Sequence, residues 1–242
     1  MPEEPYYRPD LARIHHLGFG FHAEETAPGV IGLLEPVRDG LVIEVGCGSG
    51  LLTRRLIDAG FQVIATDASP AMLALAEEVV PDAAELRRLT LPDDPIPEAD
   101  AIVSVGHALS YLDGADQVTL ALAAIADALR PGGVLAIDLC DLEYAAARTD
   151  QGAKGWAGDD WALVTEFAVP APDRFVRQMA IFTRNADGSW RRDDERHDNV
   201  MVDTSTVPAL LAEHGVEATV RSSFGDEELP VGLKVIAGRK TG

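Results

Sequence analysis

Short apolar runs alternate with stretches of helical spacing between residues 41 and 140. Runs rich in Val, Ile, Leu and Ala predict buried strands at 41–45, 61–66, 101–105 and 134–139, with a weaker candidate at 85–88. Apolar residues at every third or fourth position predict helices at 51–59, 70–80 and 117–129, and Ser69-Pro70 is a start signal for the second. Strands and helices in alternation require parallel pairing, with helices on both faces. The pattern therefore predicts an α/β fold with a doubly wound, mostly parallel sheet.

The pattern changes after residue 150. Residues 151–160 are rich in Gly and Trp and are expected to form a loop. Three strand-like runs then follow without helices between them, at 160–169, 175–184 and 189–202, and Asn185-Ala186-Asp187-Gly188 is a hairpin turn between the last two. We therefore expect an antiparallel meander, followed by a helix that begins at 204–206 and by closing strands at 216–224 and 231–238.

These patterns divide the chain into four expected segments. Residues 1–40 are expected to form a helical cap over the strand ends, and residues 41–150 the α/β core. Residues 151–203 are expected to form an antiparallel β lid inserted into that core. Residues 204–242 then supply the final helix and the closing strands of the core.

Charge and composition exclude several classes of partner. The 242 residues include 40 acidic and 20 basic ones, a net charge of −20, so the surface repels nucleic acid and anionic membranes. Two cysteines are too few for a disulfide framework, and no Cys or His spacing predicts a metal site. No apolar stretch approaches the roughly 20 residues of a membrane helix, and the first residues lack a signal-peptide pattern. We expect a cytoplasmic monomer or homodimer that binds neither nucleic acid nor membranes.

The most informative motif is Glu44-Val45-Gly46-Cys47-Gly48-Ser49-Gly50, which connects the first predicted strand to the helix after it. Alternate glycines let the backbone turn tightly and approach a ligand closely. Asp67 ends the next strand, where a carboxylate can accept two hydrogen bonds from a ribose diol. A dinucleotide loop has Gly where Leu51 stands, so this loop suits a ligand without a pyrophosphate. Glu44 can face the positively charged end of S-adenosylmethionine; the alternative is a glycine-rich turn beside a solvated acid.

Three elements together resemble the class I S-adenosylmethionine-dependent methyltransferases. They are the glycine motif, the run Thr66–Met72 (TDASPAM), and Leu129–Asp138, in which LRPGG precedes a strand. The resemblance covers roughly residues 30–140, and it implies a seven-stranded sheet whose last strand is antiparallel. It also implies that S-adenosylmethionine is the cofactor and that S-adenosylhomocysteine is the product.

The same resemblance assigns parts of the cofactor to particular residues. The motif glycines would lie under its methionine part, Asp67 would take the ribose hydroxyls, and Ala68 and Met72 would line the adenine. The family carries an Asp for the adenine amino group where this chain has Thr90, whose hydroxyl can still form an uncharged hydrogen bond. The expected cofactor contacts are Glu44, Gly46, Cys47, Gly48, Gly50, Asp67, Ala68, Met72, Leu89, Thr90, Gly106 and His107.

Residues 105–112 resemble the segment that borders cofactor and acceptor in the glycine and sarcosine N-methyltransferases. The predicted meander resembles the lid of those enzymes and of the sugar N,N-dimethyltransferases. Where those enzymes have a residue with a side-chain amide, this chain has His107. Tyr111 of the same segment is expected to contact the acceptor. Their arginine for the glycine carboxylate corresponds to Cys140, which argues against glycine as the substrate. The resemblance therefore implies methyl transfer to N or O of another small molecule.

A base is needed if the acceptor is a hydroxyl or an ammonium group, because that nucleophile must lose a proton during the in-line displacement. His107 is the first candidate, since it follows the fourth strand and since histidine titrates near pH 7. The alternative is that His107 contacts only the cofactor or the acceptor. His197 and Tyr7 are the other catalytic candidates.

Residues 191–201 carry polar and charged side chains on both faces of a predicted strand. One interpretation is a solvated edge strand, whose charges discourage pairing with other chains. The other places Glu195 and His197 on the inner face of the lid, where they would bind the acceptor.

Aromatic residues and histidines gather near the N-terminus. Tyr7, His15 and Phe19 are candidates for acceptor contacts, and the alternative is aromatic packing across the strand ends. His15 and His16 point to different faces of a helix, so we expect no metal there. Two further functions stay open beside methyl transfer: a cofactor-binding protein without catalysis, and a nicotinamide-dependent oxidoreductase, against which the missing third glycine argues.

Overall fold

The computed structural model describes residues 6–148 and 152–242 and contains a larger and a smaller β-sheet. The larger sheet has seven strands in the order β10-β11-β5-β4-β1-β2-β3. All neighbours from β5 to β3 pair in parallel, whereas β11 runs antiparallel to both β5 and β10. The strands are β1 (Leu41–Val45), β2 (Gln62–Asp67), β3 (Glu85–Arg88), β4 (Ala99–Ser104), β5 (Leu129–Cys140), β10 (Val216–Arg221) and β11 (Leu233–Lys240). The predicted doubly wound sheet is confirmed.

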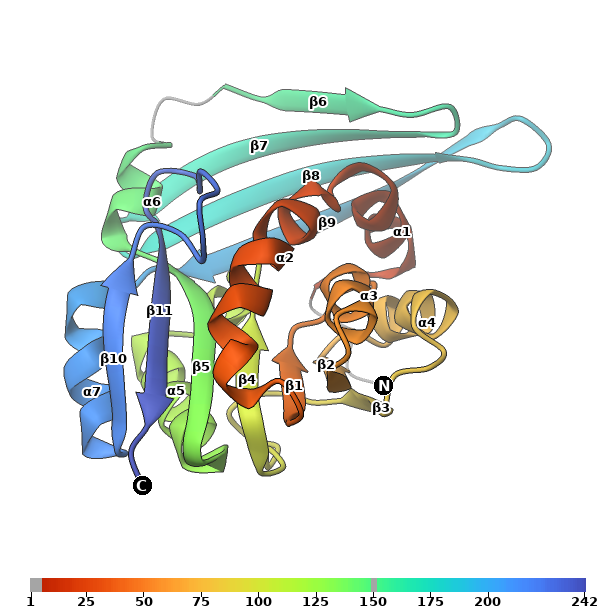
Figure 1. Ribbon diagram of the computed structural model, residues 1–242. Coiled ribbons are helices and arrows are strands. Elements are labelled where there is room, and N and C mark those ends of the chain that lie inside the picture. Colours follow the sequence, from red (N-terminus) through yellow and green to blue (C-terminus); the bar gives the residue numbers. More distant parts are fainter. Residues whose placement is uncertain (1–5, 149–151) are drawn as a thin grey trace.

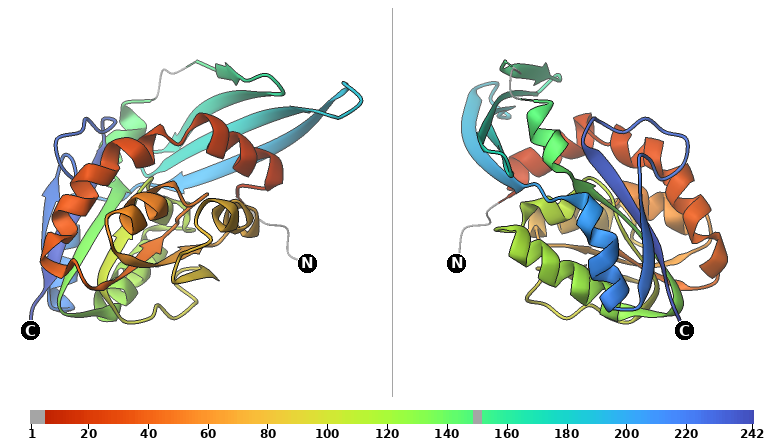
Figure 2. Two further views of the ribbon diagram at one scale, coloured as in Figure 1. Left: turned by 45° about the vertical axis from the view of Figure 1, so that its right-hand side comes forward. Right: turned by 90° about the vertical axis from the view of Figure 1, so that its left-hand side faces the viewer.

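Helices cover both faces of this sheet (Figures 1 and 2). One apolar cluster joins one face to α5 and α7, and a second joins the other face to α2 and α3, with α4 on the same side. Ser69 caps α4 as predicted, its Oγ accepting a hydrogen bond from the Met72 backbone N–H at 3.2 Å. The α-helices are α1 (Pro9–Gly18), α2 (Phe21–Leu34), α3 (Leu51–Asp58), α4 (Pro70–Val79), α5 (Ala115–Ala128), α6 (Leu142–Ala146) and α7 (Val207–Glu213), and the 3₁₀ turns are η1 (Glu35–Val37), η2 (Ala108–Tyr111) and η3 (Thr204–Thr206).

The smaller sheet is antiparallel and lies across the carboxyl ends of the parallel strands (Figure 1). Its order is β6-β7-β8-β9, formed by β6 (Lys154–Ala157), β7 (Trp161–Ala171), β8 (Arg174–Arg184) and β9 (Trp190–Val200). The three predicted meander strands are confirmed, but the predicted loop at 151–160 is wrong at 154–157. That segment is exposed and has no apolar alternation, and it becomes a strand because it pairs with β7. Residues 149–151, which hold the expected boundary between core and lid, lie outside the described residues.

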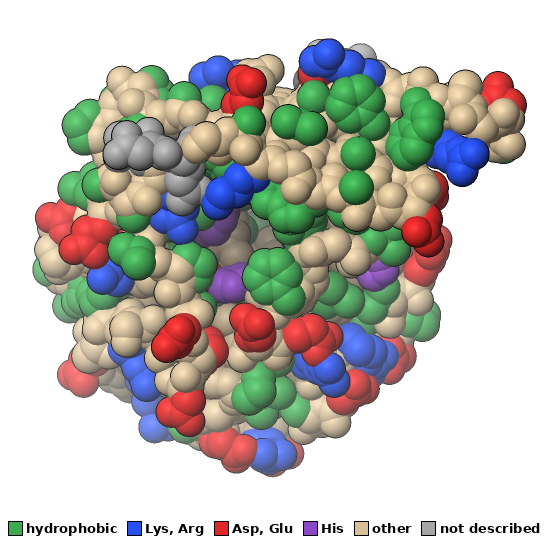
Figure 3. All heavy atoms as spheres, turned by 90° about the horizontal axis from the view of Figure 1, so that it is seen from above, with side chains coloured by type: hydrophobic (Ala, Val, Ile, Leu, Met, Phe, Trp, Pro, Cys, Tyr) green, Lys and Arg blue, Asp and Glu red, His purple; other side chains and the backbone are tan. Residues whose placement is uncertain are grey.

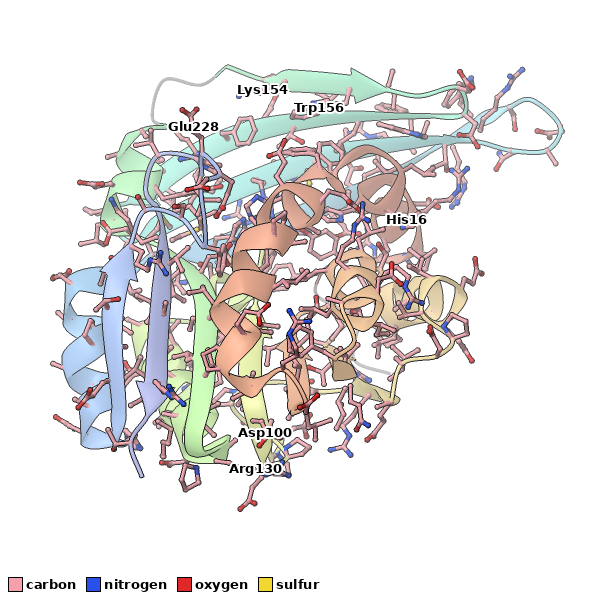
Figure 4. All side chains as sticks on the ribbon, in the orientation of Figure 1. His16, Asp100, Arg130, Lys154, Trp156 and Glu228 are labelled. Carbon is pink, nitrogen blue, oxygen red and sulfur yellow. The ribbon has the colours of Figure 1, made fainter. Side chains whose placement is uncertain are left out.

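The two faces of the smaller sheet differ. Its inner face packs on α1, where Leu11, Ile14, Trp161, Met179 and Ile181 form one apolar cluster. Its outer face carries exposed side chains such as Val164. Trp156 and Lys154 of β6 (Figure 4) pair with the inner-face residues Leu163 and Thr165, and the Trp156 ring packs against Phe19. α1 therefore connects the smaller sheet to the core.

The order of the strands in the larger sheet reverses between β1 and β4. The loops that leave these two strands diverge there, so a ligand site is expected at their carboxyl ends. At the opposite end of the sheet, Arg130 donates a 2.8 Å hydrogen bond to Asp100 (Figure 4), whose carboxylate also accepts from the Leu41 backbone N–H. None of the described helices is long and apolar enough to cross a membrane.

Candidate functional site

The loop after β1 contains three glycines with positive φ, and their roles differ. A Cβ on Gly46 would come within 2.4 Å of the Ala108 Cβ, and one on Gly50 would crowd α4 at 3.4 Å from Ala76. A Cβ on Gly48 would meet nothing closer than the Met72 sulfur at 4.0 Å, although Gly48 has a φ of +54°. Gly46 and Gly50 therefore allow the protein to pack on itself, whereas Gly48 leaves space for a ligand.

Asp67 lies beside this loop at the end of β2. Its Oδ2 accepts a 2.8 Å hydrogen bond from the Gly48 backbone N–H, and its Oδ1 accepts one of 2.8 Å from the Ser69 backbone N–H. Burial raises the pKa of Asp67, and these N–H donors oppose that rise. Each carboxylate oxygen keeps a second acceptor position, so the side chain is held in place and can still accept from a ligand.

Glu44 is buried at the end of β1, with 2% of its surface exposed. Its Oε2 accepts a 2.5 Å hydrogen bond from the Thr53 hydroxyl. Burial raises the pKa of Glu44 to about 8, mainly because a charged carboxylate loses hydration there. A cationic group in the adjoining cavity would favour the ionised form.

A single cavity of about 450 Å³ runs from the glycine loop to the aromatic residues under the smaller sheet. Figure 3, a view from the side of the smaller sheet, shows a hollow with histidine side chains inside it and basic side chains at its rim. Among the residues predicted from the sequence, those on the cavity wall are Tyr7, His15, Phe19, Glu44, Gly46, Cys47, Gly48, Asp67, Ala68, Met72, Leu89, Thr90, Gly106 and Tyr111. Four predicted residues are not on this wall: Gly50, which packs on α4, and His107, Glu195 and His197.

His107 lies next to the cavity, with its backbone in the left-handed region at a φ of +52°. This conformation costs a non-glycine residue about 1–3 kcal/mol, and Asp138 holds it by accepting from the backbone N–H of His107 at 2.6 Å and of Gly106 at 2.9 Å. The His107 ring stacks on Tyr111, with 5.8 Å between centroids, and its buried Nδ1 has no hydrogen-bond partner among the described residues. Burial and the positive charge of Arg177 lower its pKa to about 3. His107 is therefore a neutral imidazole with an unused nitrogen.

The inner face of β9 is buried even though β9 is an edge strand of the smaller sheet. Glu195 is 2% exposed, His197 is 0% exposed and Asn199 is 1% exposed, whereas Arg192 and Arg196 on the other face are exposed. The polar pattern of this strand thus combines a solvated outer face with a polar inner face directed at the core. Burial raises the pKa of Glu195 and lowers the pKa of His197.

The segment at Tyr7 connects the smaller sheet to the region of the glycine loop. Its backbone N–H donates to Glu195 at 2.9 Å, and its carbonyl accepts from the Ser69 hydroxyl at 2.9 Å. The hydroxyls of Tyr7 and Tyr111 lie 2.9 Å apart, and the ring centroids of Tyr7 and His15 are 5.2 Å apart. Phe19 and His15 stack at 6.0 Å, so the N-terminal aromatic residues both pack together and line the cavity.

Two further residues belong to this region and were not predicted from the sequence. Asp138, fully buried, also lies 3.3 Å from the Nε2 of His22. Arg177 of β8 donates to the Tyr111 hydroxyl and lies 3.2 Å from the Nδ1 of His197. A single charged residue in an otherwise apolar inward pattern is the sequence signal in both cases. Among the described residues no group of three His, Cys, Asp or Glu side chains could hold a metal ion.

The chain is similar to known methyltransferases in sequence and in structure. Residues 42–133 match the family model described as a methyltransferase domain. Rat glycine N-methyltransferase is 31% identical over 165 residues, which cover 60% of this chain and 56% of that enzyme. Over residues 42–133 the chain is therefore similar to a methyltransferase domain. The matched segment begins within β1 and includes the glycine loop, Asp67 and His107.

Solved structures share the fold of this chain over nearly its whole length. The sugar N-methyltransferase KedS8 from Streptoalloteichus matches with a TM-score of 0.81 at 19% identity, covering 100% of this chain and 97% of that one. A structure described as an S-adenosylmethionine-dependent methyltransferase from Clostridium acetobutylicum matches with a TM-score of 0.78 at 17% identity, covering 96% and 98%. The structural similarity includes the smaller antiparallel sheet, because the matched length extends beyond residues 42–133.

Proposed function

We propose that this protein transfers the methyl group of S-adenosylmethionine to a nitrogen or oxygen atom of a small-molecule acceptor. The observation that carries the proposal is the single cavity, which joins the wall formed by Gly48 and Asp67 to the wall formed by Tyr7 and Tyr111. A cofactor bound at the first wall would direct its methyl group toward the second. Residues 152–203 would then act as a lid over the acceptor.

The residues at the cofactor end suit the chemical parts of S-adenosylmethionine. Asp67 would accept hydrogen bonds from the ribose hydroxyls, and Glu44 would face the positively charged methionine end. Gly48 leaves room for the ligand where any other residue would place a Cβ. Ala68, Met72 and other apolar wall residues would contact the adenine ring.

The acceptor end provides one candidate base. His107 lies between the wall residues Gly106 and Ala108, its Nδ1 is unpaired among the described residues and its ring is neutral, so it would accept a proton from a hydroxyl or ammonium nucleophile that reaches it. A neutral amine acceptor needs little help from a base, and transfer then depends mainly on positioning. His107 therefore matters most for O-methylation or for an acceptor that arrives protonated.

Two measurements test this proposal. Calorimetric titration of the full chain with S-adenosylmethionine, S-adenosylhomocysteine and NAD should give binding of the first two and none of the third. Incubation of the protein with methyl-labelled S-adenosylmethionine and fractions of a metabolite extract should then transfer label to a small molecule. Binding of NAD alone would support an oxidoreductase, whereas cofactor binding without transfer in any fraction would support a binding protein without catalysis.

A further inference from the structure

Arg177 is a cation that contacts Tyr111 of the cavity wall, although Arg177 is not itself on that wall, and its contacts are with uncharged groups. It lies on β8 and extends from the inner face of the smaller sheet. Its Nη2 donates to the Tyr111 hydroxyl and contacts Nδ1 of His197 at 3.2 Å. Its Nε is buried and has no hydrogen-bond acceptor among the described residues. No carboxylate of those residues lies within 4.0 Å of its guanidinium group.

The nearby carboxylates are already occupied by other donors. Glu195 accepts from the backbone N–H groups of Tyr7 and Arg8 and from Nε2 of His197. Asp138 is held at the end of β5 by the backbone N–H groups of Gly106 and His107. Neither carboxylate forms an ion pair with Arg177. A guanidinium group that is half-buried without a counter-charge is costly, so the arrangement favours binding of an anion.

A second arginine adds positive charge to the same region. Arg148 lies over the ring of Tyr144, with 3.5 Å from its guanidinium carbon to the ring centroid. It donates hydrogen bonds to the backbone carbonyls of Tyr144 and Val231, which are neutral acceptors. The centroid of the Tyr144 ring lies 5.8 Å from that of His107. A chain with a net charge of −20 thus places a second cation on Tyr144, whose ring lies beside the candidate base.

We propose that Arg177 binds a carboxylate of the methyl acceptor, so that the acceptor is an organic acid. This inference rests on the proposed methyltransferase function and names its substrate class. The fork of a guanidinium group matches the two oxygens of a carboxylate, and a single negative charge balances Arg177. The aromatic rings of Tyr7, Tyr111, Tyr144 and His107 suit a flat apolar part of the same molecule. Arg177 and His107 contact Tyr111 by different groups, so a carboxylate on Arg177 would bring the nucleophile of a small acceptor toward His107.

The test compares ligands of one size that differ in charge. The full chain is saturated with S-adenosylhomocysteine and titrated calorimetrically with benzoate, benzamide, benzylamine and inorganic phosphate. Benzoate should bind at least tenfold more tightly than benzamide, and benzylamine, which is cationic at pH 7, should not bind. Equal affinity for benzoate and benzamide would overturn the proposal, as would the absence of binding by benzoate. Binding of phosphate in place of benzoate would overturn the assignment to a carboxylate.

Variants locate the effect on one side chain. Arg177→Met should weaken benzoate binding at least tenfold while changing the affinity for S-adenosylhomocysteine less than twofold. Arg177→Lys retains the charge without the fork and should give an intermediate affinity, which keeps the test valid if the Met variant does not fold. Arg184→Met, at the exposed end of the same strand, is the control and should change neither affinity. Unchanged benzoate binding in both Arg177 variants would refute the assignment, whereas failure of the wild type to bind S-adenosylhomocysteine would instead refute the proposed function.

Discussion

His197 and Glu195 form a hydrogen-bonded pair on the inner face of β9, with 2.9 Å between Nε2 and Oε2. The other ring nitrogen of His197, Nδ1, lies 3.2 Å from Nη2 of Arg177, which can only donate. A neutral imidazole satisfies both contacts when Nε2 carries the proton and Nδ1 accepts. Both nitrogens are then in use, so we interpret His197 as a residue that positions Arg177, and His107 stays the proposed base.

The first prediction compares these two histidines. His107→Gln should lower turnover of an acceptor that must lose a proton by roughly 10²–10⁴, the usual contribution of one positioned base. Its affinity for S-adenosylhomocysteine should stay within a few-fold of the wild type. His197→Gln should act mainly on the KM of the acceptor, because Arg177 loses a partner while the base is intact. Steady-state kinetics with both variants check this, and a larger turnover loss in His197→Gln would reverse the two roles.

The pH profile adds a separate readout. Burial and Arg177 lower the pKa of His107 to about 3, so kcat/KM, which reports the free enzyme, should show no limb from this histidine near its ordinary pKa of 6.5. A carboxylate bound to Arg177 would remove part of that repulsion and raise the pKa of His107. The acid limb of kcat, which reports the bound complex, should therefore lie at higher pH than that of kcat/KM. Coincident limbs would contradict this coupling.

The second prediction concerns Gly48. A Cβ at this position would enter the cavity, so Gly48→Ala should abolish or strongly weaken binding of S-adenosylmethionine. Gly60→Ala is a matched control, since Gly60 also has a positive φ, of +97°, and a Cβ there would meet nothing within 4 Å. In both variants the free energy of unfolding should fall by about 1–2 kcal/mol, because alanine is strained in the left-handed backbone conformation that glycine adopts freely. Calorimetry and thermal unfolding separate the two effects, and equal cofactor affinity in both variants would show that the loop is only a turn.

Local sequence patterns predicted most of the residues that line the cavity at the glycine loop. The glycine motif and Asp67 each follow a strand, and parallel strands bring such positions to one edge of the sheet. Because side chains alternate between the two faces of a strand, the sequence also placed Glu195 and His197 on one face of β9. It did not indicate which face of β9 is buried. Which face is buried depends on α1 and on the segment at Tyr7. The backbone N–H groups of Tyr7 and Arg8 donate to Glu195, which lies 188 and 187 positions away in the sequence.

The acceptor end was harder to predict because it depends on tertiary contacts. Arg177 shares its strand face with the buried Phe175, Met179 and Ile181, so its inward direction follows from the alternation. Its meeting with Tyr111 and His197 does not, since it requires the smaller sheet to lie over the core. β6 was missed for a related reason: its sequence has little strand character, and its strand conformation depends on pairing with β7 and on the contact of Trp156 with Phe19.

The third prediction concerns Asp67. Asp67→Ala should weaken binding of S-adenosylmethionine at least tenfold, because hydrogen bonds to a charged group contribute about 1.5–3 kcal/mol each. The variant should also unfold at a lower temperature, since the backbone N–H groups of Gly48 and Ser69 lose their acceptor. Asp39→Ala, at an exposed position between η1 and β1, is the control and should change neither quantity. An unchanged dissociation constant for Asp67→Ala would remove this residue from the cofactor site.

The last prediction concerns Glu44 and the pH dependence of cofactor binding. Burial raises the pKa of Glu44 from an ordinary value of 4.5 to about 8, so the folded protein holds a proton there that the unfolded chain has lost. The corresponding stability is fully present below pH 4.5 and is lost as the pH rises to 8. Glu44→Gln should remove this decline, which thermal unfolding of the ligand-free protein across that pH range would measure.

Cofactor binding should reverse the protonation of Glu44. If the positively charged methionine end of S-adenosylmethionine faces this carboxylate, binding at about pH 6.5 must release the proton, and affinity should rise with pH up to about tenfold per unit. Calorimetry at that pH in two buffers of different ionisation enthalpy should detect the release of about one proton per bound ligand. Glu44→Gln should release none and bind more weakly, whereas Glu77→Gln, an exposed glutamate on α4, should behave like the wild type. Wild-type binding without proton release would place the cationic end of the cofactor away from Glu44, because a neutral carboxyl group offers little attraction to a charge.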